Sequence, residues 1–263
     1  MLRILTFNTW KCEGDYFARL ALMRQQLARL DVDVLCLQES FVAPTGQVAD
    51  HQRGESLAVD TGKALAQALG MQLHHAPARH KSRAFQGAMV PSTSGLAVLT
   101  RSHADAMEVF QLPQDARDGE RIAQALLVRV EDAPPIRIIN LHLTHLRDRD
   151  DLRVAQLEAV LARWGGDETP VLLAGDFNAT FEGPSFSPLR ARSDLDVGPV
   201  PPDEWSGTLL TATPSRAIDH VLLLRGEHSP APTILSRRRV LDLADAAGLL
   251  PSDHAGVLVE LGF

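Results

Sequence analysis

The sequence predicts an α/β fold of the α+β type, in which two packed sheets of mixed strand direction carry helices on their outer faces. Three observations support this prediction. Short apolar runs rich in β-branched residues recur along the chain, and stretches with helical spacing lie between them. The order begins with alternating strands and helices, changes to consecutive strands, and then returns to helix and strand. Such a mixture is typical of sheets that pair both parallel and antiparallel strands.

Eight short apolar runs are predicted to be strands. Several are apolar at nearly every position, as expected of strands that are covered on both faces. Turn-forming stretches such as Ala133-Pro134-Pro135 separate them from the next element. The eight predicted strands are residues 2–7, 32–37, 95–100, 125–130, 136–141, 171–174, 218–224 and 256–261.

Three segments between these strands have the spacing of an amphipathic helix. In the first, Phe17, Leu20 and Met23 follow one another at intervals of three, which places them on one helical stripe. In the last, the stripe ends at Trp164. The three predicted helices are residues 17–30, 55–69 and 148–164.

The length of 263 residues fits one large domain or two small ones. Because no repeat, low-complexity tract or long linker divides the chain, we expect a single domain over residues 1–263. The formal net charge of −7 argues against the broad basic face that non-specific duplex binding needs, although a local basic groove is compatible with it. Segment 78–94 is locally basic and is predicted to be a loop near the site.

The two cysteines and the absence of long apolar stretches indicate the compartment. Cys12 and Cys36 are too few for a disulfide scaffold, so we interpret them as reduced packing residues. No apolar stretch approaches the roughly 18 residues of a membrane span. Met1-Leu2-Arg3 leads directly into the first predicted strand without a secretory pattern. We therefore expect a soluble, cytoplasmic protein with no transmembrane segment, and no obligate protein partner is evident.

Acids, amides and histidines lie at the ends of six of the predicted strands. In a mixed sheet, strands that run in opposite directions bring their opposite ends to the same edge, so all of these side chains can meet there. A single Asn or Asp at such a position is more often a turn or cap. A buried carboxylate such as Glu39, however, must be paired or ligated. The residues are Asn8, Glu39, His142, Asp176, Asn178, Asp219, Asp253 and His254.

Taken together, the motifs around these residues resemble those of the endonuclease/exonuclease/phosphatase superfamily, the metal-dependent phosphoesterases of the DNase I fold. The resemblance runs from residue 2 to about residue 260. It implies a four-layer α/β sandwich and hydrolysis of phosphoester bonds. The motifs are Thr6-Phe7-Asn8, Leu37-Gln38-Glu39, Gly95-Leu96-Ala97-Val98-Leu99-Thr100-Arg101, Asn140-Leu141-His142-Leu143, Arg153 with Gln156, Gly175-Asp176-Phe177-Asn178-Ala179, Ile218-Asp219-His220 and Ser252-Asp253-His254.

The resemblance also implies a divalent ion, Mg²⁺ or Mn²⁺. Asn8, Glu39 and Asp253 would offer it hard oxygen ligands, which suit Mg²⁺ and do not suit a closed zinc site. His145 follows His142 by three residues, but no further cysteine or histidine has the spacing of a zinc site.

By the same analogy, two residues compete for the role of general base. His254 can act with Asp219, whose carboxylate would fix the tautomer of the imidazole. Asp176 can instead accept the proton of the attacking water directly, with Asn178 orienting that water. His142 would donate a hydrogen bond to the phosphate. The sequence does not separate these two bases.

The substrate class stays open at this stage: a small molecule, a lipid head group or a nucleic acid. The alternatives to a general phosphodiesterase or phosphomonoesterase are a DNA or RNA nuclease with the same chemistry and an inactive binding protein on this fold. The intact set of acids and histidines argues against inactivity. Arg216 is a candidate phosphate contact, and Arg237-Arg238-Arg239 is interpreted as a solvated run.

Overall fold

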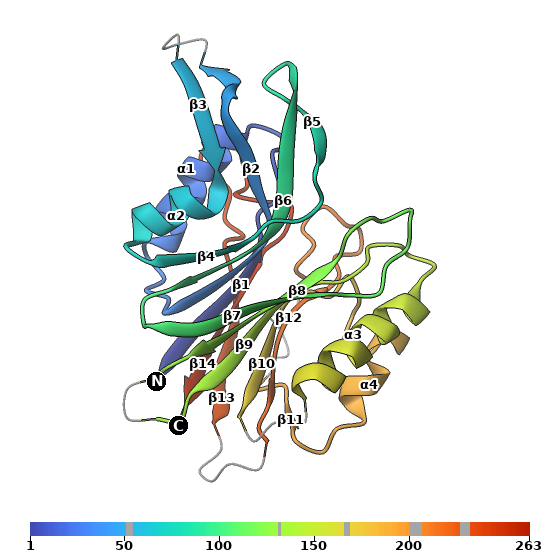
Figure 1. The fold of residues 1–263 in the computed structure, drawn as a ribbon. Helices are drawn as coiled ribbons and strands as arrows, with labels where there is room; N and C mark the ends of the chain where they lie inside the picture. Colours follow the sequence, from blue (N-terminus) through green and yellow to red (C-terminus); the bar gives the residue numbers. More distant parts are fainter. Residues whose placement is uncertain (51–54, 131–132, 166–168, 200–206, 227–231) are drawn as a thin grey trace.

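Alternation of side chains along each strand determines how the layers of the protein pack. The computed structural model describes residues 1–50, 55–130, 133–165, 169–199, 207–226 and 232–263. In the first strand, Ile4 belongs to the core between two sheets, whereas Leu5 and Phe7 belong to a core beneath helices. This alternation is the two-residue period of a strand that is covered on both faces. The sheets therefore pack face to face with helices outside (Figure 1).

The first sheet is mixed and has the order β13-β14-β1-β2-β6-β4. β1 pairs parallel with β2 and antiparallel with β14, while β3 pairs with β2 and β5 with β6. Its strands are β1 (Leu2–Asn8), β2 (Val34–Asp50), β3 (Glu55–Asp60), β4 (Gln72–Ala76), β5 (Lys81–Phe85), β6 (Ala88–Thr100), β13 (Thr233–Val240) and β14 (Gly256–Gly262).

The second sheet is also mixed and has the order β11-β12-β10-β9-β8-β7. β9 and β10 run parallel, and the other neighbours run antiparallel. Its strands are β7 (Ala104–Gln111), β8 (Ile122–Val128), β9 (Ile136–His142), β10 (Val171–Asp176), β11 (Leu195–Asp196) and β12 (Asp219–Leu224).

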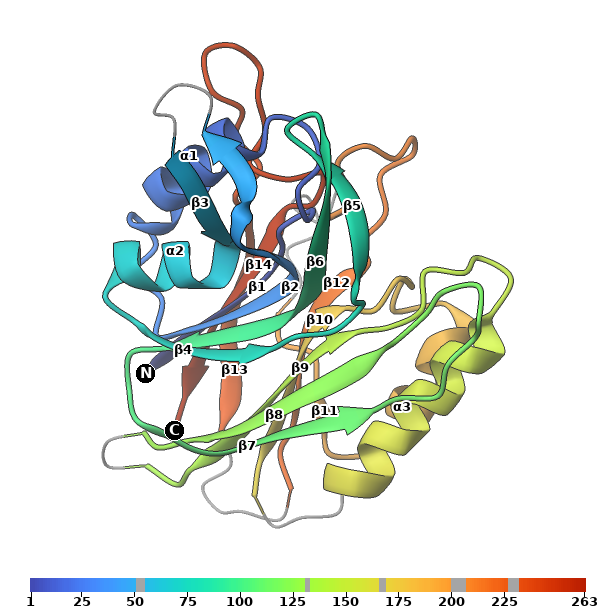
Figure 2. The same ribbon diagram turned by 45° about the horizontal axis from the view of Figure 1, so that its top comes forward.

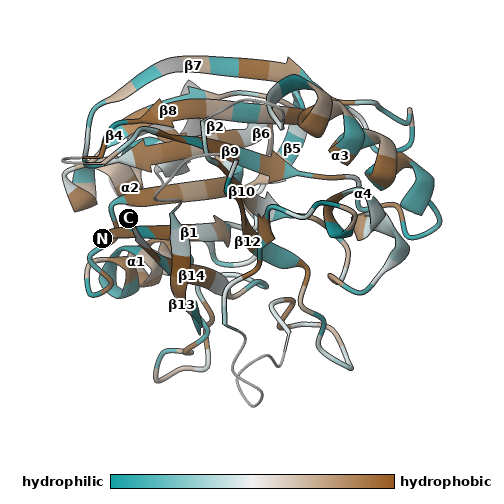
Figure 3. Ribbon diagram, turned by 90° about the horizontal axis from the view of Figure 1, so that it is seen from below, coloured by the Kyte–Doolittle hydropathy of each residue, from teal (hydrophilic) through white to brown (hydrophobic). Residues whose placement is uncertain are grey.

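The helices cover the outer faces of the two sheets and complete four layers (Figure 2). α1 and α2 pack on the first sheet through Met23 and Leu65, and α3 packs on the second through Leu157. The predicted α+β sandwich is therefore confirmed, and Figure 3 shows hydrophobic residues concentrated in its strands. None of the described helices is both long and apolar enough to cross a membrane. The helices are α1 (Tyr16–Leu27), α2 (Thr61–Leu69), α3 (Asp150–Trp164), the 3-10 turn η1 (Pro184–Phe186) and α4 (Ser187–Arg190).

The prediction of one helix over residues 55–69 is wrong in its first part. Residues 55–60 form β3, and the helix begins at Thr61. Asp60 caps it, because its side chain accepts a 2.8 Å hydrogen bond from the Lys63 N–H. The adjacent β-branched Val59 pairs with β2 instead of continuing the helical pattern.

Segment 78–94 is not a loop but contains most of the β5–β6 hairpin. Gln86 and Gly87 both have positive φ at its tip, as in the two-residue turns that hairpins favour. Phe85 is buried. Arg83 and Phe85 are buried and the intervening Ala84 is exposed, which is the period of a strand.

The arginine run 237–239 is likewise not simply solvated. It lies in β13, where the period of two turns Arg237 into the protein and leaves Arg238 exposed. β4 and β7 were also not predicted. Both cysteines, by contrast, are free and buried, as expected, and Cys36 lies in the core between the sheets.

His220, beside the site in β12, makes the fold sensitive to acid. Burial lowers the pKa of His220 to about 4, and the ring packs against Phe177 and Phe186. Because an unfolded histidine titrates near pH 6.5, the unfolded chain binds more protons between pH 6.5 and 4. This residue therefore contributes stability at neutral pH that is lost as the pH falls through that window.

We expect His220→Gln to flatten the pH dependence of stability. Urea unfolding at pH 7 and pH 4.5 should show a loss in the parent protein, of which His220 accounts for about 2 kcal/mol. The variant should lose correspondingly less, since glutamine keeps a donor for the Ala179 carbonyl but does not titrate. An equal loss in both proteins would contradict this assignment.

Candidate functional site

The candidate active site lies where strand ends of both sheets meet, and one contact joins the sheets directly. Asn8 ends β1 in the first sheet, and Asp176 ends β10 in the second. The Asn8 Nδ2 atom donates a 3.0 Å hydrogen bond to Asp176 Oδ2, and both side chains are buried. The Trp10 N–H donates to Asn8 Oδ1, which fixes the orientation of the amide.

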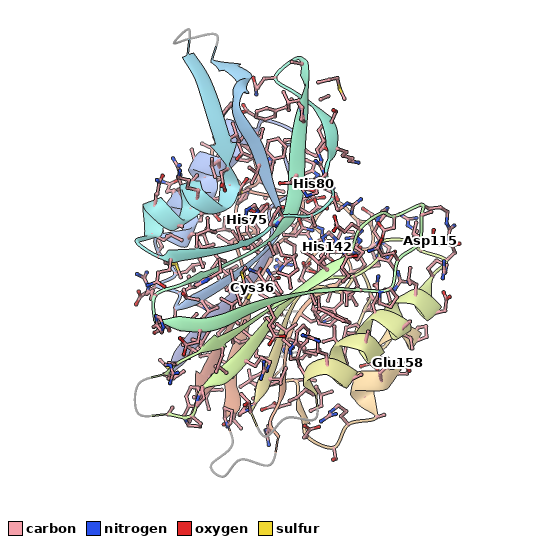
Figure 4. The ribbon with its side chains drawn as sticks, in the orientation of Figure 1. Cys36, His75, His80, Asp115, His142 and Glu158 are labelled. Atoms are coloured by element: carbon pink, nitrogen blue, oxygen red, sulfur yellow. The ribbon has the colours of Figure 1, made fainter. Side chains whose placement is uncertain are left out.

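The register of the second sheet places three predicted site residues in one row. His142 lies opposite Asp176 in the parallel β9–β10 pair, and Asp219 lies opposite Asp176 in the antiparallel β10–β12 pair. Side chains directly opposite one another share a face of the sheet. The His142 Nε2 atom accordingly lies 3.5 Å from Asp176 Oδ2. Figure 4 shows His142 close to the middle of the molecule, at the end of β9.

His254 joins this row from the segment before β14. Its Nδ1 atom lies 2.8 Å from Asp219 Oδ2, and its Nε2 atom lies 3.8 Å from Asp176 Oδ2. Although burial alone would lower it, the Asp219 carboxylate raises the pKa of His254 to about 10. Burial, with the charge of Asp219, raises the pKa of Asp176 to about 7. His254 and Asp219 are thus an ion pair, and Asp176 is the group that changes charge near neutrality.

His142 is held in its neutral form. Burial and then the charges of Arg121 and Arg79 lower the pKa of His142 well below its ordinary value. A neutral imidazole keeps one N–H donor. It is therefore able to donate one hydrogen bond to a phosphoryl oxygen while staying uncharged.

The Gly-Asp-Phe-Asn turn fixes the position of Asp176. The Asn178 N–H donates a 2.8 Å hydrogen bond to Asp176 Oδ1, and its Nδ2 donates to the Leu143 carbonyl. A Cβ at Gly175 would lie 2.1 Å from the Leu141 carbonyl oxygen, so this position requires glycine. In this geometry Asn178 joins the ends of β9 and β10.

Glu39 lies at an irregularity of β2. The pairing of β2 with β6 shifts register between Leu37 and Ser40, and Glu39 has φ of +55°. Such a bulge redirects a side chain out of the normal alternation. Glu39 Oε1 lies 2.8 Å from the ammonium of Lys11, and only 9% of Glu39 is exposed. A buried Glu39 was expected to be paired or ligated, but the sequence did not identify Lys11 as its partner.

The oxygen atoms of Asn8, Glu39 and Asp253 fit a hard divalent ion in chemistry. Burial raises the pKa of Asp253, and the charge of Glu39 adds to the rise, so the two carboxylates influence each other. The Lys11 ammonium already lies against Glu39, which shows that this end of the site attracts positive charge.

A second group of possible ligands lies beside it. One ligand atom each from Asp176, Asp219 and His254 lies within 4.8 Å of the other two. The charged His254 already donates to Asp219, however, and a protonated imidazole has no lone pair for a metal. This group therefore suits proton transfer better than metal binding.

Arg19 organises the loops around the site and was missed in the sequence. The buried face of α1 includes Tyr16 and Arg19, whereas Phe17 of the predicted stripe is 41% exposed. The spacing of Arg19, three from Tyr16 and four from Met23, fits the buried face, but that spacing alone does not predict its contacts. Its guanidinium ties the segment after Asn8 to the segment before Asp253. It donates to the carbonyl oxygens of Thr9, Trp10, Lys11, Glu13 and Pro251.

Arg153 and Gln156 hold the loop that follows His142. Gln156 Oε1 accepts a hydrogen bond from the Thr144 N–H, and Arg153 donates to the carbonyls of Thr144 and Leu146. Arg153 and Gln156 therefore serve to position the loop that follows His142.

The other candidates lie outside the central row. His145 Nδ1 lies 2.6 Å from Asp118, which is also paired with Arg121, and this charged network accounts for His145 without zinc. Arg216 is exposed, and its backbone bonds to the Thr208 segment. Its contact with phosphate stays a prediction.

Comparison with known proteins agrees with this architecture. The human Nocturnin catalytic domain with bound sulfate superposes with a TM-score of 0.68 at 21% identity, over 100% of this chain and 93% of that one. A humanized D. rerio TDP2 superposes with a TM-score of 0.72 at 17% identity, over 100% of this chain and 99% of that one. The mannosyl-6-phosphatase of Bacteroides thetaiotaomicron gives 0.68 at 20% identity, over 100% of both chains. Among curated protein sequences, none matches.

The sequence itself matches a family model. The model of the Endonuclease/Exonuclease/phosphatase family aligns with residues 5–254, which include every residue of the row described above. The chain therefore belongs to the endonuclease/exonuclease/phosphatase family of phosphoester hydrolases.

Proposed function

We propose that the protein is a Mg²⁺-dependent phosphoesterase in which water attacks the phosphorus atom. The observation that carries the proposal is the buried row of His142, Asp176 and Asp219 with His254, next to the carboxylates Glu39 and Asp253. An acid–base group beside oxygen ligands is what metal-assisted hydrolysis requires. The names of the Nocturnin, TDP2 and mannosyl-6-phosphatase neighbours describe proteins of the same fold.

Asn8, Glu39 and Asp253 would hold the ion. When bound, it supplies charge stabilisation to a phosphoryl oxygen and to the leaving oxygen. Mn²⁺ has similar ligand preferences and should replace it.

Asp176 is the residue we assign as general base. Its Oδ1 accepts the Asn178 N–H and its Oδ2 accepts the Asn8 amide, so the carboxylate is oriented from two sides. His254, paired with Asp219, remains a cation that stabilises negative charge on the phosphate. His142 donates its N–H to a phosphoryl oxygen. This assignment selects Asp176 over His254, the two bases that the sequence left open.

We expect the purified protein to hydrolyse p-nitrophenyl phosphate or bis-p-nitrophenyl phosphate when Mg²⁺ or Mn²⁺ is present. EDTA should stop the release of p-nitrophenol, and added metal should restore it. Turnover that survives EDTA would contradict the proposal. If plasmid DNA is cleaved as well, a steep fall of that cleavage with salt would indicate the nuclease alternative.

Metal binding and catalysis should separate in two variants. Glu39→Gln should weaken Mn²⁺ binding, which calorimetry measures. The loss should exceed the factor of about 10–100 that is typical when a residue that only orients a metal ligand is replaced. Asp219→Asn should keep Mn²⁺ affinity but lower kcat by about 10²-fold or more, because His254 loses the carboxylate that keeps it charged.

The exposed Glu158 of α3 provides a matched control (Figure 4). Glu158→Gln should change neither quantity. Equal losses of metal affinity in the Glu39 and Asp219 variants would argue against the separation of roles.

A further inference from the structure

Lys11 is a cation placed on Glu39, the carboxylate that we propose as a metal ligand. Its ammonium contacts Glu39 at 2.8 Å, and its side chain is 25% exposed. The backbone at this point is unusual, since Trp10 and Lys11 both have positive φ. The buried Arg19 guanidinium donates to the carbonyls of both residues and holds them in this conformation. The start of the Lys11 side chain is thus fixed, while its end reaches the site.

The type of residue is informative in this chain. Only three of its 26 basic residues are lysines: Lys11, Lys63 and Lys81. An arginine would hold a carboxylate through a rigid two-pronged fork, whereas lysine carries a point charge on a flexible stem. A lysine at Glu39 can therefore release its partner and turn to another anion nearby.

The surrounding charges define where that anion would lie. The charges of Arg121, Arg79 and Lys11 all lower the pKa of His142, so these three cations lie near it. Asp118 pairs with both Arg79 and Arg121. Of these three cations, Lys11 instead pairs with Glu39, the carboxylate proposed to bind the ion.

Lys11 and a divalent ion compete for Glu39, because two cations that share one carboxylate repel each other. Resting on the proposed function, we propose that Lys11 is a substrate-binding residue. Its ammonium contacts Glu39 in this structure, and it moves to a phosphoryl oxygen when the ion takes that carboxylate.

This exchange favours phosphomonoesters over phosphodiesters. A phosphomonoester carries close to two negative charges at neutral pH, since its second pKa is near 6. One negatively charged phosphoryl oxygen can then face the ion while another faces Lys11. A diester carries a single charge and gains less from the second cation.

Metal and phosphate binding to the full chain test the exchange without turnover. Lys11→Met should bind Mn²⁺ at least about tenfold more tightly than the parent, because the competing ammonium is gone. In saturating Mg²⁺ it should bind inorganic phosphate at least about tenfold more weakly. Lys11→Arg should bind Mn²⁺ more weakly than the parent, since the fork holds Glu39. Calorimetry measures all three.

Lys63→Met, on the exposed side of α2, is the matched control and should match the parent in both titrations. In activity assays, Lys11→Met should lose more kcat/KM on p-nitrophenyl phosphate than on bis-p-nitrophenyl phosphate. Unchanged or weaker Mn²⁺ binding in Lys11→Met, or unchanged phosphate binding, overturns the exchange while leaving the proposed function intact. If neither the parent nor Lys11→Met binds Mn²⁺, the metal-dependent function falls with it.

Discussion

Two buried amide contacts fix how the sheets lie on one another at the site. Gln38 in the first sheet donates a 2.7 Å hydrogen bond to Asn140 in the second, and Asn8 donates to Asp176 in the same direction. Asn140 in turn donates to the carbonyls of Leu37 and Ala97. Leaving one such buried group unpaired costs about 1–3 kcal/mol, whereas the apolar contacts around it tolerate small shifts. The amides therefore select the one stacking of the sheets in which Asp176 and its neighbours His142 and Asp219 meet the end of β1.

The charges around the site divide into two sides that a phosphate would bridge. In the proposed function, Glu39 and Asp253 would supply negative charge for an ion, and the cations near His142 would supply positive charge for the phosphate. Burial makes each charge effective, because little water screens it. Both histidines are buried, and their neighbours separate them: His254 stays charged beside Asp219, whereas His142 stays neutral beside arginines. One side-chain type thus serves two purposes in one pocket.

The sequence was sufficient for the sandwich and for the meeting of distant strand ends. Strand ends are readable because Asn8 and Asp176 end short apolar runs, and the mixed order of elements allows opposite ends to meet at one edge. The sequence was insufficient for the β5–β6 hairpin. Its strand β5 contains the basic residues Lys81 and Arg83, and such residues are also typical of a solvated loop. Arg237 was misread for the same reason, because a run of arginines suggests solvent until the period of β13 is known.

Lys11 and Arg19 could not be identified from local pattern alone. The contact of Lys11 with Glu39 depends on a bulge in β2 and on two residues of positive φ, neither of which has a clear sequence signature. Arg19 looks like an ordinary helical arginine until five carbonyl oxygens from two distant segments surround it. Both roles arise from backbone geometry, which the sequence specifies only through the whole fold.

The proposed function depends on a single ion position between the two sheets. A crystal soaked in Mn²⁺ and measured for anomalous scattering gives that position directly. We predict one strong peak at about 2.0–2.3 Å from carboxylate oxygens of Glu39 and Asp253, with the Lys11 ammonium withdrawn. A peak centred on Asp176, Asp219 and His254 instead, with Lys11 still on Glu39, would contradict it.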